Sequence, residues 1–157
     1  MSSGATSLAV NAGFENGSGP WAPLASGTNF VVYQGGQVAG ESARSGSYYG
    51  ATNTQMSGGG IYQDVALSTS PGQSVCGSAW VRTQYPGTGG AGTFALWLLG
   101  GSSNENGVAT FSSLGNAGNW TQVSTCVTAT TAHTTLRIQF YPQPGGPTID
   151  IDDVDVS

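Results

Sequence analysis

The chain has 157 residues, a formal net charge of −5 and only three cationic side chains, all arginines. So few cations argue against nucleic acid, whose phosphates are bound mainly by Lys and Arg, and against anionic membrane surfaces. No apolar run approaches the roughly 20 residues of a membrane-spanning helix. The many glycines are accompanied by evenly spread aromatic residues and valines, which predicts a folded, turn-rich β protein instead of a disordered chain.

Ten short strand-like runs follow one another along the chain, separated by clusters of Gly and Ser. They lie at residues 7–13, 29–35, 47–53, 60–67, 74–83, 93–100, 109–114, 120–130, 135–142 and 148–156. No segment has the 3.6-residue period of an amphipathic helix over three turns. The pattern predicts an all-β fold, a two-sheet antiparallel β-sandwich or a barrel. We expect one domain over residues 7–157, preceded by an N-terminal tail at residues 1–6.

Alternation assigns a core side to the strands at 74–83, 93–100 and 135–142, because successive side chains point to opposite faces. The opposite sides carry aromatic rings and hydrogen-bonding groups where a solvated sheet normally carries Thr, Ser, Lys and Glu. A sugar ring stacks its apolar side on aromatic rings and offers hydroxyls to planar polar groups. The predicted carbohydrate-binding face consists of Trp80, Arg82, Trp97, Arg137, Gln139 and Tyr141. The alternative is that the tryptophans are core residues and the two faces are inverted.

Catalytic patterns are weak in this sequence. The single histidine, His133, lies in the turn-like stretch TTAHTT without an acidic neighbour, which predicts a surface turn. The chain has no GxSxG nucleophile motif and no zinc-ligand spacing. A glycoside hydrolase would need two carboxylates brought together by the fold. We therefore expect a protein without catalytic residues, and a small hydrolase is the less favoured alternative.

Acidic residues gather near both ends of the chain. Glu15 lies in the glycine-rich stretch NAGFENGSGPW at 11–21, and Asp152 lies in IDIDDVDV at 149–156. The first and last strands of a sandwich are often neighbours, and Ca²⁺ prefers carboxylate and carbonyl oxygens. This pattern suits a calcium site, and solvated acids near the chain ends are the alternative.

Two cysteines, Cys76 and Cys126, both lie in predicted strands. A disulfide between them would close a loop of about fifty residues, worth roughly 4 kcal/mol in the chain-entropy model. It would also indicate an oxidising, secreted setting. Two buried free thiols are the alternative.

An ordered set of motifs resembles the carbohydrate-binding modules with a galactose-binding-like jelly roll that are appended to xylanases and β-glucanases. The motifs are NAGFENG…W at 11–21, SARSGSYYG at 42–50, GGIYQDVALSTSPGQ at 59–73, SAWVR at 78–82, WTQVS at 120–124, LRIQFY at 136–141 and IDIDDVDV at 149–156. They cover nearly the whole chain and are more specific for the fold than for the ligand.

The resemblance implies one structural Ca²⁺ that ties the start of the chain to its end. Carried over by position, its ligands would be Gly13, Glu15, Ser45, Ser47 and Asp152. Arg44 departs from the family pattern, because a small or polar residue is common at that position.

The resemblance also implies glycan binding in a groove on the concave sheet, with side chains from SAWVR and LRIQFY; Trp97 is added from alternation alone. Gly77 departs from the family, which usually has a large apolar residue there, and the loops at 84–90 and 100–107 have no clear counterpart. We expect a secreted, monomeric module of a larger extracellular enzyme that binds a polysaccharide or oligosaccharide. A structural or protein-interaction jelly roll is the alternative.

Overall fold

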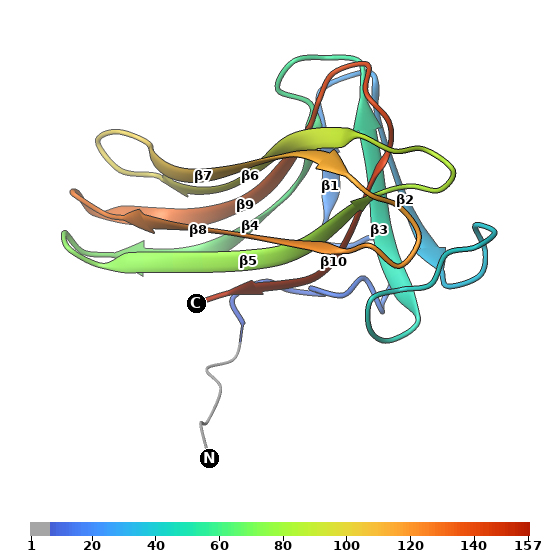
Figure 1. The fold of residues 1–157 in the computed structure, drawn as a ribbon. Helices are drawn as coiled ribbons and strands as arrows, with labels where there is room; N and C mark the ends of the chain where they lie inside the picture. The colour runs from blue at the N-terminus through green and yellow to red at the C-terminus, as the bar shows by residue number, and fades with distance from the viewer. Residues whose placement is uncertain (1–6) are drawn as a thin grey trace.

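Two five-stranded antiparallel sheets pack face to face in the computed structural model, which describes residues 7–157 (Figure 1). The first sheet has the order β1 (Ala22–Leu24), β4 (Gly60–Thr69), β9 (His133–Pro142), β6 (Gly90–Leu99) and β7 (Glu105–Leu114). The second has the order β2 (Thr28–Gln34), β3 (Tyr48–Thr54), β10 (Ile149–Val156), β5 (Ser74–Thr83) and β8 (Thr121–Thr128). The predicted two-sheet β-sandwich is confirmed. The predicted tail at 1–6 lies outside the described residues.

Nine strands match predicted runs, but the prediction of a strand at 7–13 is wrong. These residues form turns, because Asn11 has a φ of 50° and its side-chain amide donates hydrogen bonds to the carbonyls of Gly17 and Gly19. An Asn side chain that bonds nearby backbone favours turns over strands. The remaining observed strand, β1, was not predicted. It is three residues long with Pro23 at its centre, and so short a run shows no alternation of apolar and polar residues.

The core lies between the sheets and follows the predicted alternation. Val75, Ala79 and Val81 of β5 are buried, and Phe94 of β6 stacks on Phe140 of β9 with ring centroids 5.0 Å apart. Burying each such side chain contributes about 1.5–3 kcal/mol.

The glycine at position 77 has a packing reason. A Cβ there would lie 3.2 Å from the ring of Phe94 and 3.1 Å from Val156, so neighbouring side chains already fill this part of the core. The residues that the structure describes include no helix long and apolar enough to cross a membrane.

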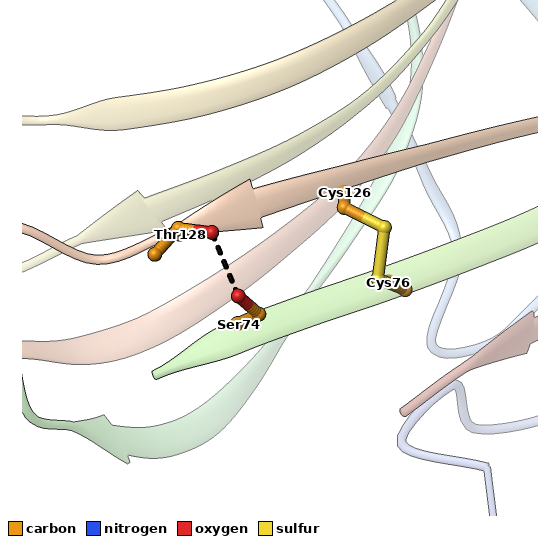
Figure 2. The surroundings of a disulfide bond; sticks show 4 residues. All are labelled: Ser74, Cys76, Cys126 and Thr128. Atoms are coloured by element: carbon orange, nitrogen blue, oxygen red, sulfur yellow. Dashed lines mark hydrogen bonds between the residues drawn. A yellow bond between two sulfur atoms is a disulfide. The ribbon is translucent and has the colours of Figure 1, made fainter. Parts of the chain in front are cut away.

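Cys76 and Cys126 form a disulfide across β5 and β8, where they are directly opposite in register (Figure 2). Ser74 and Thr128 lie on the same two strands, each two residues from a cysteine. Their hydroxyls hydrogen-bond to each other across the strands, at 2.7 Å. Both cysteines are exposed on the outer face of the second sheet. The predicted disulfide is confirmed, and the alternative of buried free thiols is wrong.

Candidate functional site

The outer face of the first sheet carries four of the six predicted binding residues. In the register of β6 and β9, Trp97 lies opposite Arg137, and Ala95 lies opposite Gln139. Tyr141 lies one row further along β9, and the indole nitrogen of Trp97 donates a 2.9 Å hydrogen bond to its hydroxyl. Trp97 and Tyr141 are half-buried, so their rings are not between the sheets. The interpretation of Trp97 as a core residue is therefore wrong.

These four side chains line a hollow of about 310 Å³, which we call the Trp97 hollow. Its size is at the lower end of the roughly 300–1,000 Å³ that is typical of ligand sites. Its complete lining is Leu24, Gly58, Trp97, Leu99, Asn104, Arg137, Gln139 and Tyr141. Leu24 was not predicted from the sequence, because it belongs to the unpredicted strand β1. Asn104 was not singled out either, although the loop at 100–107 that contains it was noted.

Gln139 is the most buried polar residue in the lining of the Trp97 hollow. The residue is only 1% exposed, and its amide nitrogen is buried without a hydrogen-bond partner. A buried donor left unpaired costs roughly 1–3 kcal/mol. An acceptor oxygen on a ligand would recover that free energy.

Arg137 is held by a carboxylate on the neighbouring strand. Its Nε and Nη2 donate hydrogen bonds of 2.8 and 3.0 Å to the two carboxylate oxygens of Asp64, and the guanidinium lies 4.5 Å from the ring centroid of Tyr62. The hydrogen bonding of Arg137 to the carboxylate of Asp64 is the main cause that raises the pKa of Arg137. The positive charge beside the hollow is therefore neutralised within the protein.

The other two predicted residues do not share this face. Trp80 and Arg82 belong to β5, so they lie on the outer face of the second sheet, on the far side of the sandwich. Trp80 is half-buried, with the guanidinium of Arg44 stacked 3.8 Å from its ring centroid. The prediction of one continuous face is wrong for these two residues, because alternation identifies the core side of a strand but not the sheet that the strand joins.

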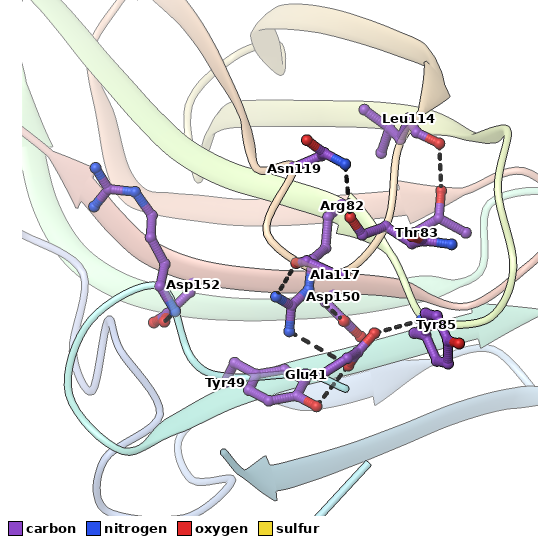
Figure 3. A network of polar contacts seen from close by, with 12 residues as sticks. Glu41, Tyr49, Arg82, Thr83, Tyr85, Leu114, Ala117, Asn119, Asp150 and Asp152 are labelled. Atoms are coloured by element: carbon purple, nitrogen blue, oxygen red, sulfur yellow. Dashed lines mark hydrogen bonds and ion pairs between the residues drawn. The ribbon is translucent and has the colours of Figure 1, made fainter. Parts of the chain in front are cut away.

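Arg82 is the centre of a buried polar network (Figure 3). Its Nε donates a 2.8 Å hydrogen bond to Asp150, its Nη2 lies 3.3 Å from Glu41, and its guanidinium lies 4.0 Å from the ring centroid of Trp120. All three ionisable side chains are inaccessible to solvent. Burial raises the pKa of Asp150 above its usual range. With no exposed surface, Arg82 stabilises the fold and is not available to a ligand.

The predicted calcium ligands come together where the first turn meets the last strand. Glu15 accepts hydrogen bonds from the backbone nitrogens of Ser47 and Tyr48, at 3.0 and 3.1 Å. Asp152 accepts them from Arg44 and Ser45, at 2.9 and 3.3 Å. Both carboxylates therefore contact the same turn, residues 44–48.

The glycine at position 46 makes room for the carboxylate of Glu15, whereas Gly13 only lies near both carboxylates. A Cβ on Gly46 would lie 2.2 Å from a carboxylate oxygen of Glu15, so any side chain there would displace it. A Cβ on Gly13 would lie 3.6 Å from Asp152 and 3.7 Å from Glu15. Burial, followed by the negative charge of Asp153, raises the pKa of Asp152 to about 7.

Asp153 was not predicted as part of this cluster. Its carboxylate forms a 2.8 Å ion pair with Arg44. Within residues 7–157, no three His, Cys, Asp or Glu side chains form a metal-binding group by themselves. A metal held here would need backbone carbonyls or water in addition to carboxylates.

His133 is not in a surface turn, which corrects the sequence prediction. It begins β9 and is only 2% exposed, and its Nε2 donates a 2.6 Å hydrogen bond to Glu105. Glu105 also accepts hydrogen bonds from the backbone nitrogens of Thr130 and Thr131. The hydroxyl of Thr130 donates a further hydrogen bond to Glu105. This bond first, then those from His133 and the Thr130 backbone, lower the pKa of Glu105 to about 2. The pair ties the ends of β7 and β9 together.

Comparison with solved structures shows which proteins share this fold. A carbohydrate-binding module, TmCBM61, in complex with β-1,4-galactotriose has a TM-score of 0.65 and 18% identity, covering 98% of this chain and 99% of its own. The CBM22-1 xylan-binding domain of Paenibacillus barcinonensis Xyn10C has a TM-score of 0.62 and 13% identity, covering 87% and 83%. The Stig cyclase Fisc from Fischerella sp. TAU has a TM-score of 0.70 and 16% identity, covering 97% and 96%.

A scan against protein-family models and a search of curated proteins gave no match. At these identities the structural likeness concerns the fold. The chain thus has the jelly-roll fold of carbohydrate-binding modules.

Proposed function

We propose that this protein is a non-catalytic carbohydrate-binding module that holds a polysaccharide or oligosaccharide on the outer face of its first sheet. One observation carries the proposal. In the Trp97 hollow, the unpartnered amide of Gln139 lies beside two half-buried aromatic rings joined by a hydrogen bond.

The chemistry of this arrangement matches a sugar ring. Trp97 and Tyr141 offer apolar ring surface for the axial C–H face of a pyranose. Gln139 offers a donor that a hydroxyl or ring oxygen would satisfy. Asn104, an exposed amide at the rim, can bond further hydroxyls.

The charge of the site favours an uncharged glycan. Asp64 neutralises Arg137 through two hydrogen bonds, so the described lining of the hollow offers no free cation to pair with a uronic acid. The net charge of −5 would also repel a polyanion.

Secretion and attachment to a catalytic domain complete the proposal. The disulfide suits an oxidising compartment. One structural neighbour is a CBM22-1 module joined to a GH10 module in Clostridium thermocellum xylanase 10B, with a TM-score of 0.64. Such a module would raise the local concentration of its enzyme at the substrate.

The cyclase among the neighbours makes catalysis the second candidate. Proton-transfer chemistry in the Trp97 hollow would need an acid or base there. Its described lining contains no Asp, Glu or His, and burial raises the pKa of its one phenol, Tyr141, further from neutral pH. The lining therefore suits binding better than acid–base catalysis.

A glycan screen with two matched variants tests the proposal. The protein is run in affinity gels with soluble polysaccharides and in pull-downs with insoluble ones, with calcium present, as wild type, Trp97→Ala and Trp80→Ala. We expect one neutral polymer class to retain the wild type and Trp80→Ala but not Trp97→Ala. Loss of binding in Trp80→Ala alone would move the site to the second sheet. Failure of every glycan to bind would favour a structural or protein-interaction role.

We further propose that one structural Ca²⁺ binds where Glu15 and Asp152 meet the turn at 44–48. Carboxylates and backbone carbonyls are the hard oxygen ligands that Ca²⁺ prefers. Gly13, Ser45 and Ser47 would add carbonyl oxygens. Arg44 already pairs with Asp153. The carboxylates of Glu15 and Asp152 would therefore balance the two positive charges of the Ca²⁺ ion. The ion would fix the first turn against the last strand.

A further inference from the structure

A second hollow lies on the other side of Tyr141. It has a volume of about 350 Å³, and Thr93, Phe111 and Gln143 are among its lining residues. We call it the Gln143 hollow. Tyr141 and Gly58 line both hollows, so the two adjoin each other on the same face.

Gly58 and Tyr141 form the junction of the two hollows. Gly58 has a φ of +82°, and a Cβ built on it would meet no atom within 4 Å. Among the described residues, Tyr141 is therefore the only one whose side chain lines both spaces.

The Gln143 hollow also combines polar groups with an aromatic ring. Thr93 gives it a hydroxyl and Gln143 an exposed amide, and Tyr141 is its half-buried ring, whereas its other apolar lining residues Phe111 and Pro142 are buried. No intramolecular hydrogen bond to the side-chain amide of Gln143 is present among the described residues. The backbone of Gln143 is fixed, since its nitrogen donates a 2.9 Å hydrogen bond to the carbonyl of Ala91.

The lining residues of the two hollows extend along much of one strand. Leu99 lines the Trp97 hollow and Ala91 lines the Gln143 hollow, and both belong to β6. They are eight positions apart, so their Cα atoms lie about 27 Å from each other at a rise of roughly 3.4 Å per residue. A ligand that contacted both ends of this row would have to be longer than one sugar ring.

We infer that the Gln143 hollow is a second glycan subsite, so that one neutral chain crosses Tyr141 and occupies both hollows with consecutive sugar units. This inference rests on the proposed function. It adds that the ligand is an oligosaccharide segment longer than a disaccharide. It also adds that Thr93 and Gln143 contact sugar units that Trp97 does not reach.

Calorimetric titration with oligosaccharides of increasing length tests this inference. The probes are the disaccharide, trisaccharide and hexasaccharide of β-1,4-xylose, β-1,4-galactose and β-1,4-glucose. The proteins are wild type, Thr93→Ala/Gln143→Ala, Trp97→Ala and the control Gln122→Ala, an exposed residue on β8 of the second sheet. Thermal melting of each variant checks that the fold is kept.

For the series that binds, we expect the hexasaccharide to bind wild type at least about tenfold more tightly than the disaccharide, a difference of about 1.4 kcal/mol. The double variant should lose most of this gain while its disaccharide affinity stays within about twofold of wild type. Trp97→Ala should weaken both, and Gln122→Ala neither.

Equal affinity for short and long oligosaccharides would overturn the second subsite and leave the proposed function standing. The same holds if the double variant keeps the full gain with length. If no series binds to wild type, the proposed function fails and the subsite fails with it.

Discussion

The guanidinium of Arg82 lies 2.8 Å from a carboxylate oxygen of Asp150, and neither side chain has any exposed surface. Glu41 is equally buried and lies 3.3 Å from the same guanidinium. Two acidic side chains therefore share one cation at a position that solvent does not reach, and Glu41 also accepts hydrogen bonds from Tyr49 and Tyr85. Breaking such a group by removing one partner typically costs about 3–5 kcal/mol, because it leaves an uncompensated buried charge.

We therefore expect Arg82→Met to lower the free energy of unfolding by about 3–5 kcal/mol, measured by urea denaturation. Arg44→Met is the matched control, since its pair with Asp153 is partly exposed and such pairs contribute only about 0–1 kcal/mol. Adding Asp150→Asn to Arg82→Met should restore part of the loss, because one buried charge is removed. A cost no larger than that of the control would show that the buried network does not stabilise the fold.

Removal of the disulfide should destabilise the protein without changing its fold. Cys76 and Cys126 are separated by 50 residues in sequence, and closing such a loop is worth about 4 kcal/mol in the unfolded state. Both residues are exposed, so Cys76→Ser/Cys126→Ser should leave no cavity. Chemical denaturation of the variant should give an unfolding free energy lower by about this amount. Ser74→Ala, which breaks the neighbouring hydroxyl bond, should have a far smaller effect.

The pair formed by Glu105 and His133 should make the stability of the fold depend on pH in the acid range. The pKa of Glu105 is about 2 in the fold and about 4.3 in an unfolded chain. A lowered folded pKa means that this contribution is present above the unfolded pKa and is lost as the pH falls toward 2. Glu105→Gln should therefore be less stable than wild type at pH 7, and the difference should narrow between about pH 5 and pH 2.

Urea unfolding at several pH values measures this difference. Asp155→Asn serves as the control, because Asp155 is exposed and forms no side-chain hydrogen bond in the described structure. A gap between Glu105→Gln and wild type that stays constant down to pH 2 would contradict the prediction.

Binding of the glycan should be nearly independent of salt. Screening weakens interactions between charges, with a Debye length of about 10 Å at 0.1 M and 3 Å at 1 M ionic strength. Because Asp64 neutralises Arg137 and the proposed ligand is uncharged, the Kd should change less than about twofold over this range. Calorimetry at several NaCl concentrations measures it. A Kd that rises steeply with salt would indicate an anionic glycan.

Chelation should lower the melting temperature if calcium binds as proposed. A ligand at about 100 times its Kd stabilises a fold by about 2.7 kcal/mol. For a chain of this size that corresponds to a shift of roughly 5–10 °C between excess Ca²⁺ and EDTA. Differential scanning fluorimetry measures the shift.

Variants test whether the calcium-dependent change in melting temperature arises at the proposed site. Glu15→Gln and Asp152→Asn should each reduce it strongly, because each removes a carboxylate that would bind the ion. Glu105→Gln, a carboxylate at another site, should keep the shift in full. A melting temperature that is equal with Ca²⁺ and EDTA would remove the calcium proposal.

Much of the architecture followed from local patterns. Alternation identified the core sides of β5, β6 and β9, because a strand buried on one face must carry its apolar residues at every second position. The pairing of Cys76 with Cys126 was one of two open interpretations, and register decides it by placing the two residues opposite each other. β1 was missed, since three residues around a proline carry no period.

The candidate site was predicted only in part. Trp97, Arg137, Gln139 and Tyr141 were correctly placed on one polar face, but Trp80 and Arg82 have the same alternation and lie on the other side of the molecule. Leu24 and Gly58 come from unpatterned segments, and only the folded chain brings them to the Trp97 hollow.

The sequence by itself therefore determined the all-β class and the inward and outward sides of most strands, because both depend on hydrophobic contrast between adjacent residues. The tertiary structure alone decided which outward sides share a sheet and which outward polar residues are then buried. It placed Arg82 beneath the loops that carry Glu41 and Ala117, and it buried Gln139 in the lining of the hollow that Trp97 and Tyr141 share. The order of strands in a sheet, and the loops that cover its outer face, depend on contacts between residues far apart in the chain. A local sequence pattern does not contain this information.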